Sequence, residues 1–210
     1  MGTNKQNYTV LRHEATIDIL QPGTGVFTYF TDLTENHYKA LISVRIEDIT
    51  GGSPNAQLIV TPRTGPDTTI NFTESAAIQI EDARAVKLST SSPGIIGGSM
   101  NIVKDFCMCC SDLGEVQRHE ETFSFRGSDF LFTDLTENHY TAMVVVRGRL
   151  EGEVVVTPRT GDPVTITLPP NARGVIQIED AQSLSIETRP AREEPRNTVE
   201  IIKDFCISCP

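Results

Sequence analysis

Hydrophobic and polar residues alternate with a period of two along much of the chain. In residues 40–48, Ile42, Val44 and Ile46 fall on one face of an extended segment. Short β-branched runs at 143–146 and 154–156 also favour strands. Clusters of Gly, Pro, Asp and Asn separate such segments at intervals of roughly 8–12 residues, which is typical of all-β proteins. The pattern predicts an all-β fold with no helix longer than a turn.

The same pattern of residues occurs twice. The nine residues from Phe30 to Tyr38 recur letter for letter from Phe132 to Tyr140. Four further blocks match in the same order, at 10–16 and 116–122, 60–65 and 156–161, 78–83 and 176–181, and 104–107 and 203–206. Such ordered self-similarity indicates an internal duplication. We expect a short N-terminal arm at 1–7, one β-sandwich module at 8–110, a linker at 111–115 and a second module at 116–210. Because the linker is so short, the modules should lie close together.

The spacing of the strands indicates a particular kind of sandwich. About eight strands are predicted in the first module, near 8–20, 26–33, 39–49, 56–64, 68–73, 76–82, 85–91 and 100–108. Eight short strands in about 100 residues fit a jelly roll, so we expect two tandem jelly-roll-like β-sandwich modules. An immunoglobulin-like sandwich is the alternative, but it usually has a core Trp and an internal Cys pair, and the sequence has neither.

The charge of the chain argues against two classes of partner. The 210 residues have a formal net charge of −10. Nucleic-acid binding needs a basic face, and an acidic chain is repelled by anionic membranes. No apolar run is long enough to span a bilayer. The first seven residues have no apolar core of a signal peptide, so we expect synthesis in the cytoplasm without one.

Five cysteines lie at the ends of the two modules, at Cys107, Cys109, Cys110, Cys206 and Cys209. The number is odd, so one chain cannot pair them all. In a straight strand, residues i and i+3 point to opposite faces, which disfavours a disulfide within one tail. Disulfides between modules or between subunits are the leading interpretation. A Cys₄ zinc site and inert thiols are the alternatives.

No catalytic motif or cofactor site is apparent, and we do not expect an enzyme. The four histidines, His13, His37, His119 and His139, are interpreted as turn or strand residues on a polar face. The acid pairs at 81–82 and 179–180 are interpreted as strand ends. Arg63 and Arg159 follow Pro in identical turns, where each is solvated and paired with a nearby acid, or contacts another subunit.

Two stretches of each module carry a family resemblance. They are Ala77 to Leu88 with Phe106-Cys107, and Val175 to Ile186 with Phe205-Cys206. These stretches resemble the jelly-roll subunits of bacterial endospore appendages, the Ena family. The resemblance implies a leaderless subunit that assembles into fibres by sheet augmentation and is cross-linked by disulfides once the mother cell lyses. Residues 1–7 contain no cysteine, unlike the N-terminal connector of that family, so only the terminal-strand cysteines carry over, onto Cys107 and Cys206.

We therefore expect a structural subunit that binds copies of itself and ends on a spore surface or outside the cell. A phage-like tail or capsid component and a carbohydrate- or ligand-binding module are the alternatives. The repeated polar turn, at 34–37 and 136–139, is either a local turn or an assembly contact. The candidate assembly contacts are Glu35, Asn36, His37, Glu137, Asn138, His139, Arg63 and Arg159.

Overall fold

The computed structural model describes residues 8–35, 37–48, 55–109, 114–125, 128–136, 139–148, 152–168, 173–188 and 197–208. These residues form strands and turns with no helix, so the predicted all-β fold is confirmed. In this part of the chain no helix is long and apolar enough to cross a membrane. The strands are β1 (Tyr8–Asp32), β2 (Tyr38–Asp48), β3 (Ala56–Pro62), β4 (Thr68–Phe72), β5 (Ser75–Glu81), β6 (Ala83–Cys109), β7 (Gly114–Phe125), β8 (Asp129–Thr133), β9 (Tyr140–Arg147), β10 (Gly152–Pro158), β11 (Val164–Thr167), β12 (Gly174–Glu179), β13 (Ala181–Thr188) and β14 (Asn197–Ser208).

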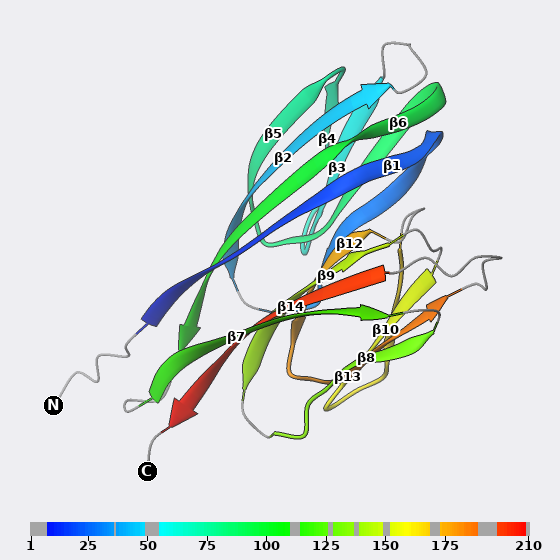
Figure 1. Ribbon diagram of the computed structural model, residues 1–210. Helices are drawn as coiled ribbons and strands as arrows, with labels where there is room; N and C mark the ends of the chain where they lie inside the picture. Colours follow the sequence, from blue (N-terminus) through cyan, green and yellow to red (C-terminus); the bar gives the residue numbers. More distant parts are fainter. Residues whose placement is uncertain are drawn as a thin grey trace, which may run out of the picture.

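In the first repeat, the strands pair in the orders β5-β2-β6-β1 and β4-β3-β6-β1. The long strands β1 and β6 belong to both sets, because β1 runs antiparallel to β6 from Tyr8 to Thr31. The register between them shifts between Pro22 and Thr24, where the β1–β6 pair passes from one set to the other. Figure 1 shows these two strands running the length of the upper part of the molecule.

The second repeat has the same pairing with shorter strands. Its sets are β12-β9-β14-β7 and β11-β10-β13-β8. The register is also the same, since Lys203 faces Ala142 and His119 just as Lys104 faces Ala40 and His13. This is the strand order of a jelly roll. The prediction of eight strands fits the second repeat, whereas the first has six because β1 and β6 each join two predicted strands into one.

The two repeats share one sheet. The end of β1 pairs in parallel with β12, with Phe30 opposite Val175, Thr31 opposite Ile176 and Asp32 opposite Gln177. This pairing fuses strands of both repeats into a ten-stranded sheet, and β8, β10, β11 and β13 form a separate four-stranded sheet. Figure 1 shows β12 beside β1 where the two repeats meet. The repeats therefore lie in contact, as the short linker predicts, while the domain boundaries stay a prediction.

The hydrophobic core also crosses between the repeats. One cluster is formed mostly by the first repeat but includes Met143, Val145, Val175 and Ile202 of the second. The alternate residues of β9 point into the second repeat's own core. Strand β9 is thus apolar on both faces, which explains why residues 143–146 form a continuous hydrophobic run.

Candidate functional site

The contact between the two repeats, here called the internal junction, combines strand pairing with a shared hydrophobic cluster. Beyond the paired strands, the backbone N–H of Leu33 donates to the carbonyl oxygen of Gln177 at 2.8 Å. The backbone N–H of Glu35 donates to Glu179 Oε2 at 3.1 Å. The repeated polar turn in its first occurrence therefore continues the sheet pairing into the second repeat.

A buried histidine lies at the centre of this junction. His13 has no exposed surface, and its Nε2 is 2.7 Å from Asp204 Oδ2. Its Nδ1 is 3.2–3.3 Å from the side-chain amide of Gln177, and its ring packs edge-on against Phe106. The expectation that this histidine lies on a polar face is wrong. The second repeat covers that face, so His13 instead makes polar contacts to two residues more than 160 positions away.

Arg118 completes the polar cluster. Its Nε and Nη2 donate to the two carboxylate oxygens of Asp204 at 2.7 and 2.8 Å, and Nη2 also donates to the carbonyl oxygen of Arg12 at 2.9 Å. Burial by itself would raise the pKa of Asp204, but the hydrogen bonds from Arg118 and His13 outweigh it and hold that pKa below its ordinary value. Asp204 is therefore a charged group, fully buried and paired on both sides.

Two arginines of the second repeat reach the outer part of β1. Arg147 Nη2 donates to the carbonyl oxygen of Thr16 at 3.4 Å. Arg173 forms an ion pair with Asp18 at 3.0 Å. Both contacts extend the junction along the strand that carries His13.

The repeated turn is held by a buried carboxylate in both repeats. Asp32 Oδ1 accepts hydrogen bonds from the backbone N–H and hydroxyl of Thr34, and Asp32 Oδ2 lies 2.7 Å from Lys104 Nζ. Burial lowers the pKa of Lys104, against the opposing effect of Asp32. Asp134, Thr136 and Lys203 repeat this arrangement with a Lys–Asp distance of 2.8 Å.

In each repeat, the histidine of the turn makes a second local contact, with an aspartate. His37 Nδ1 is 2.6 Å from Asp82 Oδ2, and His139 Nδ1 is 2.7 Å from Asp180 Oδ2. Asp82 and Asp180 adopt left-handed φ values of 49° and 47° directly after β5 and β12. Asp tolerates this conformation, which explains an acidic residue at these strand ends.

The two arginines that the sequence offers as assembly contacts each lie against the polar turn of their own repeat. Arg63 Nη2 lies 3.3 Å from Thr34 Oγ1 and 3.7 Å from an oxygen of Asp32, and Arg159 Nη2 lies 3.1 Å from Asp134 Oδ2. Their guanidinium groups also lie over the rings of Tyr38 and Tyr140. Each arginine is thus paired with a nearby acid of its own repeat.

The cysteine tails are described in part. Cys107 is an exposed free thiol, whereas Cys206, at the matching position of the second repeat, is half-buried and is not free. The side chains of Cys109, Cys110 and Cys209, and the candidate contacts Asn36, Glu137 and Asn138, lie outside the described residues. Among the residues that are described, no three His, Cys, Asp or Glu side chains are arranged to hold a metal ion.

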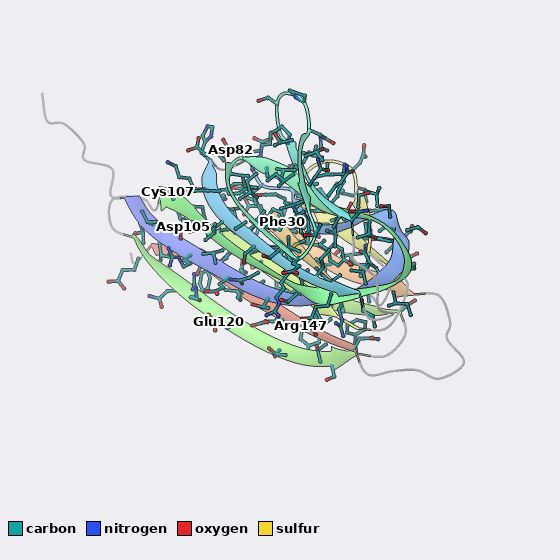
Figure 2. All side chains as sticks on the ribbon, turned by 90° about the horizontal axis from the view of Figure 1, so that it is seen from above. Phe30, Asp82, Asp105, Cys107, Glu120 and Arg147 are labelled. Atoms are coloured by element: carbon teal, nitrogen blue, oxygen red, sulfur yellow. The ribbon has the colours of Figure 1, made fainter. Side chains whose placement is uncertain are left out.

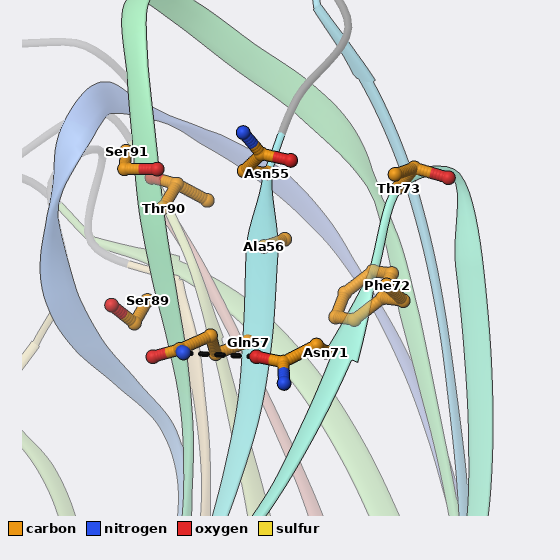
Figure 3. Close-up of a pocket in the computed structure, with 9 residues that line it drawn as sticks. All are labelled: Asn55, Ala56, Gln57, Asn71, Phe72, Thr73, Ser89, Thr90 and Ser91. Carbon is orange, nitrogen blue, oxygen red and sulfur yellow. Dashed lines mark hydrogen bonds between the residues drawn. The ribbon is translucent and has the colours of Figure 1, made fainter.

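A polar cavity of about 590 Å³ lies over β3, β4 and β6, away from the junction. Figure 3 shows that amide and hydroxyl side chains line it, with Gln57 Nε2 donating to Asn71 Oδ1 at 2.9 Å. Phe72 is the one aromatic side chain among the described residues of its lining. A carbohydrate-binding site usually offers aromatic faces to the sugar, so this lining does not favour the ligand-binding alternative.

Comparisons with known proteins give only distant similarities. No family model matches the chain, and no curated protein matches it. A structure of Bacillus endospore appendages, which form disulfide-linked pili, shares 12% identity over 51% of this chain and 96% of its own, with a TM-score of 0.41. The STIV MCP shares 9% identity over 94% and 96%, and Macrobrachium rosenbergii nodavirus shares 11% over 98% and 92%, each with a TM-score of 0.30. The family resemblance stays a prediction, and the functional argument rests on the internal junction.

Proposed function

We propose that the protein is a non-enzymatic structural subunit that assembles with copies of itself by pairing sheet edges. One observation carries the proposal: the chain already joins two jelly-roll repeats by such a pairing, between β1 and β12. An open sheet edge presents unpaired N–H and C=O groups and is a ready template for another strand. The internal junction satisfies one pair of edges in this way.

Among the described strands, each repeat also has a sheet edge that is not paired with another strand. In the described part of the chain, β5 pairs only with β2, and β8 pairs only with β13. These are the strands that match β12 and the end of β1. Because the same two kinds of edge already pair within the chain, we expect them to pair between molecules as well.

The cysteines supply a means of fixing the assembly. Cys107 is exposed and free at the open end of the first repeat. We propose that it forms a disulfide with a cysteine of a neighbouring molecule, with dioxygen accepting the two electrons and two protons that the thiols release. Such oxidation does not occur in a reducing cytosol. It fits a protein that acts on a spore surface or in an extracellular fibre after lysis.

Sedimentation velocity and negative-stain microscopy of the purified chain, with and without reductant, test this function. We expect concentration-dependent filaments or rings, and material that withstands denaturant only after oxidation. The variant Cys107→Ser should still assemble but lose that resistance. A chain that stays monomeric at every concentration and redox condition would rule the function out.

A further inference from the structure

The internal junction is formed by one surface of each repeat. Because the repeats match, each also carries a counterpart of the surface that the other contributes, and these two counterparts do not contact each other within the described part of the chain. One half, here called the donor, is supplied by the first repeat, and the matching residues of the second repeat lie at its free edge. The other half, the acceptor, is supplied by the second repeat, and the matching residues of the first repeat are open. The donor residues His13, Phe30 and Leu33 correspond to His119, Phe132 and Leu135, and the acceptor residues Gln177, Glu179 and Asp204 correspond to Gln79, Glu81 and Asp105.

The open acceptor end has the geometry of the occupied one. Arg12 binds both carboxylate oxygens of Asp105 at 2.7 and 3.0 Å, as Arg118 binds Asp204. Hydrogen bonding from Arg12 also lowers the pKa of Asp105, so this carboxylate is charged like its counterpart. Yet the Asp105 side chain is 39% exposed, whereas that of Asp204 has no exposed surface.

A cavity of about 360 Å³ marks the vacant place. Its lining includes Gln79, Glu81 and Asp105, the counterparts of the three residues that the first repeat contacts in the internal junction. Figure 2 shows Asp105 and Cys107 at the same end of the molecule as Asp82, and all three line this cavity. The cavity is therefore shaped for a donor end that the chain itself does not place there.

The donor end of the second repeat also resembles its counterpart in the first repeat. The ring of His119 packs edge-on against Phe205 at 4.7 Å, as that of His13 packs against Phe106 at 4.8 Å, but His119 is exposed. Leu135 is 89% exposed, whereas Leu33 packs against the core of the second repeat. The donor end thus exposes a leucine and a ring-packed histidine at the two positions where Leu33 and His13 meet the second repeat.

We propose that a second copy of this chain docks its β8 edge in parallel against β5, with His119 entering the cavity beside Asp105 and Gln79. The register of the internal junction places Phe132 opposite Ala77 and Asp134 opposite Gln79. This inference rests on the proposed function and adds the surface, the register and the polarity. Because donor and acceptor differ, the contact is head-to-tail and repeats from one molecule to the next.

Differences between the repeats make the outer contact weaker than the inner one. The acceptor face has Leu41 and Ser43 where the second repeat has Met143 and Val145. The donor face has Glu121 where the first repeat has Ala15. Less apolar area is buried, so the histidine cluster accounts for more of the affinity.

Two one-sided variants of the full chain test the polarity. The donor variant His119→Ala/Leu135→Asp and the acceptor variant Gln79→Ala/Asp105→Ala each change only exposed or half-exposed side chains, so both should fold. Sedimentation velocity should show each variant alone as a monomer, with at least a tenfold higher dissociation constant than wild type. Mixed together they should form a dimer and nothing larger, because one intact donor meets one intact acceptor.

The outcomes separate this inference from the proposed function. If the wild-type chain assembles and either variant assembles equally well, the surface is wrong while the function stands. Dimers in one variant alone would contradict the head-to-tail polarity. If the wild-type chain never assembles, both proposals fail. A variant of the opposite face of β7, Glu120→Ala, serves as the matched control and should assemble like wild type.

Discussion

His13 Nε2 lies 2.7 Å from Asp204 Oδ2, although 191 positions separate the two residues and neither side chain is exposed. One residue comes from the first strand of the chain and the other from the last. This contact joins the two repeats at a polar point that solvent does not reach. If either partner is removed, the other loses a hydrogen bond that solvent does not restore.

His13→Ala should therefore destabilise the chain strongly. Among the described residues it leaves the buried Asp204 with its hydrogen bonds to Arg118, and loss of a hydrogen bond to a charged group costs about 2 kcal/mol. The matched variant His119→Ala changes an exposed residue and should stay within about 0.5 kcal/mol of wild type. Urea unfolding of both variants measures the difference. Equal losses would show that the junction does not depend on His13.

Acid should weaken the junction through Asp204. Its pKa is lowered in the folded chain from about 3.9 in the unfolded one. A carboxylate with a lowered folded pKa stabilises the protein above its unfolded pKa and loses that contribution as the pH falls through the folded pKa. Asp204→Asn should thus be less stable than wild type at pH 7, and the difference should shrink below about pH 4.

Thermal unfolding of both proteins from pH 7 to pH 2 checks this expectation. Asp105→Asn is the control, because its pair with Arg12 is largely exposed and contributes less. A difference between Asp204→Asn and wild type that stays constant with pH would mean that the charge of Asp204 is not the source of its effect.

Lys104→Met should be among the most damaging single substitutions in the first repeat. It leaves Asp32 buried and without its closest cation, and breaking a buried pair costs about 3–5 kcal/mol. Lys203→Met should cost less, because Lys203 keeps 15% of its side chain exposed. Lys39→Met, which removes only an exposed pair with Glu81, is the control. Guanidinium unfolding of the three variants gives the order.

Glu121→Ala should strengthen association between molecules. The residue occupies the place of Ala15, and a carboxylate there has to lose water when the donor end is covered. The dissociation constant measured by sedimentation should fall for Glu121→Ala and stay unchanged for Glu120→Ala, whose side chain points to the other face of the strand. Unchanged assembly in both variants would place Glu121 outside the contact.

Period-two patterning and the duplicated blocks are sufficient to predict an all-β chain and the end of a strand just before Thr34. The merger of two strands into β1 is not predictable in this way, because Pro22 and Gly23 read as a break, whereas the register shift at Pro22 lets the strand continue. Turn residues do not end a strand when a long partner such as β6 holds both sides of the shift.

The burial of His13 was also not predicted, although one signal for it is present in the sequence. Residues 143–146 are uniformly apolar, while the matching residues 41–44 include Ser43. This difference is explained by the burial of β9 on both faces, and not by random divergence of the two repeats. The polar partners of His13 come from elements far apart in the sequence, so their convergence needs the tertiary fold.

The two-sided burial of β9 has a consequence for how a polymer of this chain would break. Every second contact along such a polymer lies within one chain and has the larger apolar face, and its halves are also tied covalently, which gives them a high effective concentration. The contacts between chains lack the larger apolar face, and before Cys107 is oxidised they also lack a covalent tie. Dilution or tension should therefore sever the polymer at chain boundaries only, and fragments should always contain an even number of repeats.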